Sequence, residues 1–276
     1  MSTDEQELQR WRDALAEQPT GWDFSTLTGF REEEPPWRWR TAVENLSQKA
    51  DRVLDLGTGG GEVLASLADA LPEGTVATEG WAPNLPIARE RLVPLGIEVV
   101  EHDSEAPGAR LPFEDDSFDL ILSRHEAFAP ADVARVLRPS GAFLTQQVGG
   151  DDLREVREAF GLGDPHADVT LESMVHDLVA AGLRVDRSHA FHGRYEFDDM
   201  SSLLGYLRRA PWDAPEDLDV DRHREALERL AAQMQDGPLI ATVSRFVILA
   251  RAPEAPDAGR VDFSALTGQD LEVPRV

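Results

Sequence analysis

The chain has 276 residues, of which 41% are hydrophobic, and it carries a formal net charge of −25. That apolar content suffices for a large core, whereas the acidic balance disfavours nucleic acid and anionic membranes as partners. The chain has no cysteine, which excludes disulfides and thiolate metal sites, and we predict no metal site.

The first twenty residues are polar and acidic, unlike a secretory signal peptide, and no apolar run approaches the roughly 18 residues of a membrane span. These features lead us to expect a soluble, cytoplasmic protein.

Residues 1–50 are expected to form a cap region of helical pieces around an aromatic loop. From residue 51, short apolar segments alternate with amphipathic ones. Such alternation with short connections predicts a parallel sheet covered by helices on both faces. The expected strands are residues 52–57, 74–80, 97–103, 117–125 and 142–150, and the expected helices are residues 61–71, 84–96 and 130–141.

The alternation becomes looser after residue 150. There we expect helices over residues 151–160 and 170–182 and strands over residues 183–193 and 244–251. The resulting organisation is a cap region (1–50), a core (51–194 and 244–252), a helical insertion that serves as a substrate lid (195–243) and a tail (253–276).

A glycine cluster, Gly57, Gly59, Gly60 and Gly61, lies between the first core strand and the first core helix. Glycines there let the backbone approach a ligand at the carboxyl end of the strand. A dinucleotide fingerprint needs a further glycine where this chain has Glu62, and no G-K-[ST] follows. The G-x-G-x-G spacing, preceded by Asp55, therefore points to a nucleoside that bears a positive group and no phosphates.

Acidic residues also end the next two expected strands. Glu79 ends the second strand, where a carboxylate accepts both ribose hydroxyls. Asp103 follows His102 at the end of the third strand and can accept a hydrogen bond from an adenine amino group. Three acids at successive strand ends beside a glycine loop indicate one nucleoside site.

With these motifs in place, residues 53–148 resemble the class I S-adenosylmethionine-dependent methyltransferases. "VLDLGTGGG", "VATEGW" and "VVEHD" are similar to the first three motifs of that superfamily, and "LPFEDDSFDLILSRHEAF" and "VARVLRPSGAFLTQQV" to the fourth and fifth. The resemblance implies a Rossmann-like, doubly wound α/β fold with a seven-stranded, mostly parallel sheet, whose one antiparallel strand would be "SRFVILAR". It also implies S-adenosyl-L-methionine as cofactor, S-adenosyl-L-homocysteine as product, and the following cofactor-binding residues: Asp55, Gly57, Thr58, Gly59, Gly61, Glu79, Gly80, Trp81, His102, Asp103, Ser104, Ser123 and Arg124.

The segment Ser123–Glu126 replaces the Asn/Asp-Pro-Pro-Tyr/Phe motif of amide and base N-methyltransferases. A hydroxyl acceptor needs a base, and His125 is the leading candidate because it follows the fourth core strand. A histidine that packs against the cofactor is the alternative. Glu126 is the second catalytic candidate, with an exposed acid as its alternative. His189 and His192 point to opposite faces of a strand, which indicates structural roles.

Substrate selection is expected in the two irregular additions. Trp37, Tyr206 and Trp212 are the aromatic candidates for lining an acceptor pocket, although they could instead anchor the added helices. The sequence predicts a methyltransferase that acts on the oxygen or nitrogen of a small-molecule acceptor.

Two other functions stay open. One is a ribosomal RNA methyltransferase, which the acidic charge disfavours; one such group also carries a cysteine zinc module that this chain lacks. The other is a protein that binds S-adenosylmethionine without methyl transfer. The oligomeric state is undetermined.

Overall fold

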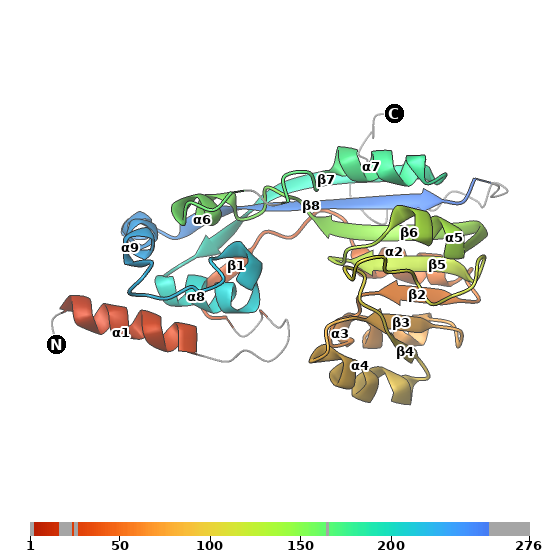
Figure 1. The fold of residues 1–276 in the computed structure, drawn as a ribbon, viewed down its shortest axis with the longest axis horizontal. Helices are drawn as coiled ribbons and strands as arrows, with labels where there is room; N and C mark the ends of the chain where they lie inside the picture. Colours follow the sequence, from red (N-terminus) through yellow and green to blue (C-terminus); the bar gives the residue numbers. More distant parts are fainter. Residues whose placement is uncertain (1–2, 17–23, 25–26, 164–165, 254–276) are drawn as a thin grey trace. The chain divides into compact units, whose positions relative to one another are not determined.

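The computed structural model describes residues 3–16, 24, 27–163 and 166–253. The chain forms two compact units, which we call the helical unit (Met1–Glu34, Gly149–Asp168 and Phe191–Ser244) and the sheet unit (Pro35–Val148, Val169–Ala190 and the chain from Arg245). Both long strands β7 and β8 contribute residues to each unit (Figure 1). Most of the expected tail, residues 254–276, lies outside the described residues.

The strands form one mixed sheet of eight in the order β1-β7-β8-β6-β5-β2-β3-β4, rather than the seven that the resemblance implies. The pairs β2–β3, β2–β5, β3–β4 and β5–β6 are parallel. The described strands are β1 (Phe30–Glu32), β2 (Val53–Leu56), β3 (Val76–Glu79), β4 (Glu98–Glu101), β5 (Phe118–Arg124), β6 (Leu137–Val148), β7 (Arg184–Phe197) and β8 (Leu239–Arg251).

The expected antiparallel strand is confirmed, because β8 pairs antiparallel with β6 from Ala142↔Arg251 to Val148↔Arg245. The additional strand is β1, which pairs antiparallel with β7, Phe30 lying opposite Phe197. Three residues are too short for a recognisable alternation of apolar and polar residues, so β1 could not be predicted from its own sequence.

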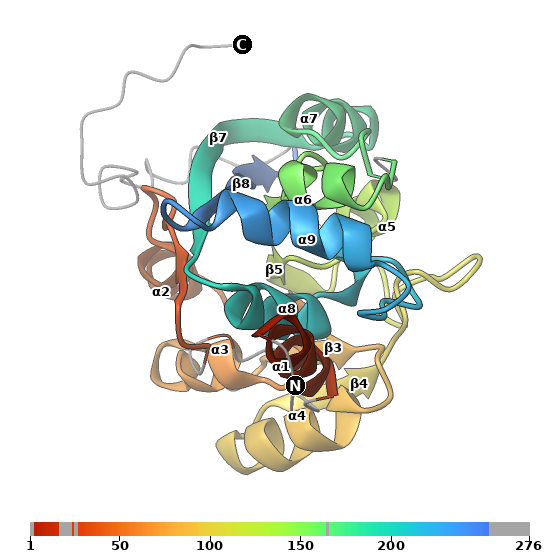
Figure 2. The same ribbon diagram turned by 90° about the vertical axis from the view of Figure 1, so that its left-hand side faces the viewer.

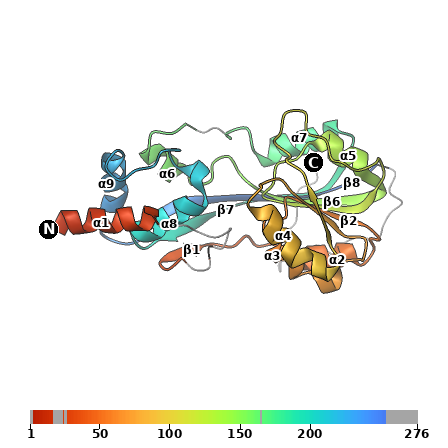
Figure 3. The ribbon, with the colours of Figure 1, turned by 60° about the horizontal axis from the view of Figure 1, so that its bottom comes forward.

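Helices cover both faces of the sheet within the sheet unit, which confirms the doubly wound α/β prediction. Figure 3 shows α5 and α7 on one face and α2, α3 and α4 on the other. On the first face, Leu178 of α7 packs with Ile121 of β5 and Phe143 of β6, and on the second, Leu92 of α4 packs with Ala77 of β3. The helices are α2 (Trp39–Ser47), α3 (Glu62–Ala65), η1 (Ala68–Ala70), α4 (Asn84–Leu92), η2 (Val93–Leu95), α5 (Pro130–Val136) and α7 (Leu171–Ala180).

Two expected helices differ from the prediction. The helix expected over residues 61–71 is split into α3 and η1, and the Ser66 hydroxyl at the break donates to the Val63 carbonyl, 2.6 Å away, a local bond that competes with regular helix. The helix expected over residues 130–141 ends at Val136. Leu137 is extended and pairs with Phe118 of β5, and Pro139 could not continue a helix there.

The helical unit is built around a core of its own. Tyr195 and Phe197 of β7 are fully buried there with Leu203 and Leu207 of α8. Helix α1 packs against α8 (Figure 2), and the Asp199 carboxylate caps α8 by accepting from the Ser202 N–H at 2.8 Å. The helices of this unit are α1 (Thr3–Ala16), α6 (Arg154–Ala159), α8 (Met200–Arg209), η3 (Pro211–Asp213) and α9 (Arg224–Gln233).

Both late strands are longer than expected. Strand β7 runs on to Phe197, into the segment assigned to the insertion, and β8 starts at Leu239. No helix in the described parts of the chain is long and apolar enough to cross a lipid bilayer.

Candidate active site

The glycine loop joins β2 to α3 at the carboxyl edge of the parallel strands. Gly57, Gly59 and Gly61 have φ of 62°, 63° and 79°. The Thr58 N–H donates to the Thr78 carbonyl at 2.8 Å, which holds the loop against β3. A Cβ on Gly61 would lie 2.8 Å from Cγ of Leu92, so this glycine allows α4 to pack closely and need not face a ligand.

Glu79 ends β3, and its side chain is buried. Its carboxylate accepts the Trp81 N–H at 2.7 Å, and the backbone N–H groups of Gly59 and Gly80 lie close enough to lower its pKa. Burial raises the pKa of Glu79, and these backbone donors oppose the shift. The carboxylate therefore lies near both the glycine loop and the turn after β3.

Gly80 brings the turns after β3 and β4 together. A Cβ on Gly80 would lie 2.6 Å from Cα of Asp103 and 2.7 Å from the carbonyl oxygen of His102. This close approach explains why glycine follows Glu79. The predicted ribose and adenine positions are thus adjacent within the sheet unit.

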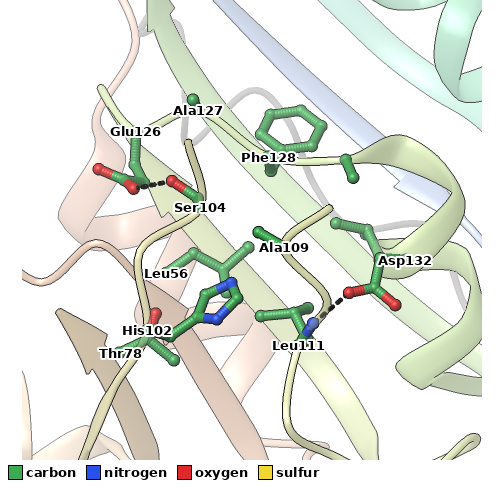
Figure 4. Close-up of a pocket in the computed structure, with 12 residues that line it drawn as sticks. Leu56, Thr78, His102, Ser104, Ala109, Leu111, Glu126, Ala127, Phe128 and Asp132 are labelled. Atoms are coloured by element: carbon green, nitrogen blue, oxygen red, sulfur yellow. Dashed lines mark hydrogen bonds between the residues drawn. The ribbon is translucent and has the colours of Figure 1, made fainter. Parts of the chain in front are cut away.

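A pocket lies beside these turns and is shown in Figure 4. His102 and Ser104 line it after β4, and Leu56 and Thr78 line it from the ends of β2 and β3. Sequence reasoning missed several of its other lining residues, namely Ala109, Leu111, Phe128 and Asp132. The Leu111 N–H donates to the Asp132 carboxylate, which fixes the "RLPF" loop at the mouth of the pocket.

Asp55 contributes a carboxylate from β2 beside the loop. Burial raises its pKa to about 7, while the nearby Arg124 opposes the shift and Glu126 and Glu79 add to it. The neighbouring Thr58 hydroxyl is close enough to lower the pKa of Asp55, but its buried oxygen has no partner with hydrogen-bond geometry in the described structure. The negative charge of an ionised Asp55 is thus poorly compensated by other groups of the protein.

The segment Ser123–Glu126 spans the end of β5 and the turn after it, and two glutamines of β6 hold it in place. The Gln147 side-chain amide donates to the Ser123 hydroxyl at 3.2 Å and to the Glu126 carbonyl at 3.0 Å. The His125 N–H donates to the Gln146 carbonyl at 2.8 Å, and His125 has φ of 61°, rare for a residue other than glycine. Sequence reasoning missed both glutamines, although two amides in an otherwise apolar strand are a detectable signal.

His125 joins a side-chain chain of hydrogen bonds. The Trp37 indole N–H donates to Oε1 of Gln146 at 2.7 Å, and Nε2 of Gln146 lies 2.9 Å from Nε2 of His125. The imidazole keeps accessible surface, yet dense protein surrounds it. This desolvation, reinforced by the charges of Arg124 and Arg245, lowers the pKa of His125 well below its usual range.

Glu126 lies between the glycine loop and the turn after β4. A Cβ on Gly57 would overlap its side chain, and its Oε1 accepts from the Ser104 hydroxyl at 2.5 Å (Figure 4). Burial raises the pKa of Glu126, and repulsion from Glu79 and other acids adds to the shift. The carboxylate is therefore part of the predicted cofactor region.

The three aromatic candidates for acceptor binding fall in different units. Trp37 is buried in the sheet unit and joined to His125 through Gln146. Tyr206 and Trp212 belong to the helical unit. Tyr206 is buried among aromatic rings, 5.0 Å from Phe24 between centroids, whereas Trp212 is 55% exposed. Their roles as acceptor ligands stay predictions.

The two histidines with predicted structural roles contact protein groups in separate units. The His189 ring lies edge-on to Trp37, with 5.8 Å between centroids. Nε2 of His192 is 3.1 Å from Oδ2 of Asp151.

The polar residues around the glycine loop fit S-adenosylmethionine. Its amino acid end bears an ammonium group beside the sulfonium, and a poorly compensated carboxylate such as Asp55 suits such a cation. Glu79 would hold the ribose, and Asp103 would hold the adenine amino group. The buried Thr58 oxygen adds a polar group without a hydrogen-bond partner in the described structure.

The comparisons with known proteins agree with this geometry. A family model described as a methyltransferase domain matches residues 54–145. Malonyl-[acyl-carrier protein] O-methyltransferase of Marinomonas sp. (strain MWYL1) is 29% identical over 174 residues, which cover 58% of this chain and 63% of that protein. Demethylmenaquinone methyltransferase of Thermus thermophilus is 33% identical over 117 residues, which cover 39% of this chain and 52% of that protein.

The chain thus spans between half and two thirds of the length of these curated relatives. A solved structure from Bacillus halodurans C-125, provisionally assigned as a methyltransferase, has a TM-score of 0.57 at 19% identity. The match covers 78% of this chain and 99% of that one, and it shows the shared fold. The matched domain, the curated relatives and the fold together support a class I S-adenosylmethionine-dependent methyltransferase.

Proposed function

We propose that the chain transfers the methyl group of S-adenosylmethionine to an oxygen or nitrogen of a small-molecule acceptor. The observation that carries this proposal is the half-buried carboxylate of Asp55 beside a glycine loop that the hydrogen bond from Thr58 to Thr78 holds against β3. Acidic residues around the loop favour a cationic ligand and repel phosphates.

Each strand-end residue has a binding task in this proposal. Asp55 holds the positively charged end of the cofactor, Glu79 accepts the ribose hydroxyls, and Asp103 accepts the adenine amino group. When bound, the cofactor supplies an electrophilic methyl carbon, which the acceptor takes while the bonding electron pair stays on sulfur. The protein supplies binding, orientation and exclusion of water.

The acceptor side is proposed to lie at His125, next to Trp37 and Gln146. Two curated relatives are named for small-molecule or carrier-bound acceptors, malonyl-[acyl-carrier protein] and demethylmenaquinone. These names support a small acceptor. A net charge of −25 argues against a ribosomal RNA substrate.

The test combines binding with product analysis. Calorimetry of the full chain with S-adenosylmethionine should give saturable binding. Incubation with methyl-labelled cofactor and fractionated small-molecule extract should then yield a labelled product and S-adenosylhomocysteine, both identified by mass spectrometry. Binding with no labelled product in any fraction would favour a cofactor-binding protein without methyl transfer, and absence of binding would refute both.

Substitution of Glu79 by alanine is expected to weaken S-adenosylmethionine binding at least about tenfold. A hydrogen bond to a charged group contributes about 1.5–3 kcal/mol, and about 1.4 kcal/mol is a decade in affinity. Calorimetry measures the change. Glu98→Ala is the control, because that exposed acid lies at the other end of the neighbouring strand β4. Unchanged affinity in a folded Glu79 variant would contradict the ribose assignment.

A further inference from the structure

The hydrogen bonds around His125 determine which ring nitrogen carries the proton. An indole N–H is only a donor, so the Gln146 atom facing Trp37 at 2.7 Å must be the amide oxygen. The other amide atom, the NH₂ nitrogen, therefore faces Nε2 of His125 at 2.9 Å. The indole N–H of Trp37 thus fixes the orientation of the Gln146 amide.

An amide nitrogen only donates, so Nε2 of His125 must be an unprotonated acceptor. The ring is then neutral, with its hydrogen on Nδ1. Nε2 is occupied by Gln146, and among the described residues Nδ1 has no hydrogen-bond partner. The ring nitrogen available to a ligand, Nδ1, is thus a hydrogen-bond donor. It cannot accept a proton from the acceptor.

The charged groups that act on His125 are both cationic. Arg124 precedes it in the chain and Arg245 lies on β8, and both lower the pKa of His125. Arg245 is 6% exposed, so its charge is weakly screened. The neighbouring acid, Glu126, turns instead to Ser104 and the glycine loop. An N–H donor in this positive electrostatic environment suits an anionic oxygen.

We propose that the Nδ1–H of His125 binds the acceptor through an oxygen that is already ionised, so that the acceptor class is a carboxylic acid, with Gln146 and Trp37 as positioning residues for the ring. This inference rests on the proposed function. A carboxylate oxygen uses a lone pair to bond the methyl carbon as the sulfur–methyl bond breaks toward sulfur. The product is an ester, and no proton has to be removed.

The first test is the tautomer itself. The full chain is labelled with ¹⁵N-histidine, and the resonances lost in His125→Asn identify the ring. Long-range proton–nitrogen correlation spectra should show protonated Nδ1 and unprotonated Nε2 at neutral pH, unchanged well below pH 6.5. A protonated Nε2, or a charged ring at neutral pH, would overturn the proposal.

A nearly isosteric substitution tests the positioning residues. Gln146→Glu places an acceptor opposite Nε2, so the proton should move to Nε2 and the pKa of His125 should rise. Trp37→Phe frees the amide to rotate and should give a mixture of tautomers. Trp81→Phe, an exposed tryptophan of the same unit, should change neither. A tautomer that is the same in all three variants would mean that Gln146 does not set it.

Acetate is the probe for the anionic acceptor. Titration with sodium acetate should shift the Nδ1–H resonance of His125 in a saturable way, and ammonium chloride at equal ionic strength should not. Arg124→Gln should weaken the acetate response about threefold or more, and Gln146→Glu should abolish it. No saturable acetate response refutes the acceptor class. Calorimetry with S-adenosylmethionine on the wild-type chain and on Gln146→Glu separates this outcome from failure of the proposed function, because cofactor binding should persist in both.

Discussion

Valine in place of Gly59 is expected to abolish S-adenosylmethionine binding while the sheet unit stays folded. Gly59 has φ of 63°, and a left-handed backbone costs a residue with a Cβ roughly 1–2 kcal/mol, with branched side chains fitting worst. The Gly59 N–H also lies close enough to the Glu79 carboxylate to lower its pKa. The variant should therefore lose both the loop conformation and the alignment of the predicted ribose ligand. Calorimetry should detect no binding, and circular dichroism should stay near native.

Gly96→Val is a matched control for backbone strain. Gly96 has φ of 79° and ends η2, and a Cβ there would meet nothing within 4 Å. This variant should lose similar stability and keep its affinity. Normal cofactor affinity in the Gly59 variant, or an equal loss of affinity in both variants, would contradict the assignment of the loop as the cofactor site.

Asp55→Asn is expected to change affinity and stability in opposite directions. Loss of a charged partner of the cofactor should weaken binding by about 1.5–3 kcal/mol, roughly ten- to a hundredfold. The unliganded chain should become more stable at pH 8, because burial raises the pKa of Asp55 from 3.8 to about 7. The gain is at most roughly 4 kcal/mol, from about 1.4 kcal/mol per pKa unit. Calorimetry and thermal unfolding measure the two effects.

The titration of Asp55 gives the stability of the unliganded chain a pH dependence of definite sign. The folded chain keeps the Asp55 proton up to pH about 7, whereas the unfolded chain releases it near 3.8. The contribution of this group to the free energy of unfolding therefore falls between about pH 4 and 7 and is constant above that range. Cofactor affinity should instead rise with pH through 7 as the carboxylate ionises. In Asp55→Asn, the pH dependence that this carboxyl gives to the free energy of unfolding and to cofactor affinity should disappear.

Asp119→Asn is the contrasting control. The Asp119 carboxylate accepts the N–H groups of Asp51 and Arg52 at 3.0 and 2.9 Å and pairs with Arg138 at 3.0 Å. Its substitution should lower the unfolding temperature and leave cofactor affinity unchanged. A gain in stability at Asp119, or none at Asp55, would contradict the assignment of a poorly compensated charge to Asp55.

The proposed acceptor side of the site depends on contacts that no local sequence pattern contains. Trp37 and Gln146 are 109 residues apart in the chain and meet at 2.7 Å. His125 alone fits a base or a packing residue equally well, and its hydrogen-bond partners support the donor role that we propose. The short helix α3 and the three-residue strand β1 likewise depend on packing and pairing that their own residues do not encode.

By itself the sequence determined the doubly wound fold and predicted a cofactor site, and its resemblance to the methyltransferases implied the antiparallel last strand. It could do so because strand–helix alternation forces a parallel sheet, and because Asp55, Glu79 and Asp103 end strands whose carboxyl ends share one edge. Only the tertiary structure decided the eighth strand, the poor compensation of Asp55, and the pairing of His125 with Gln146 and Trp37. Those features arise from burial and from hydrogen bonds between distant segments, which appear only when the chain is folded.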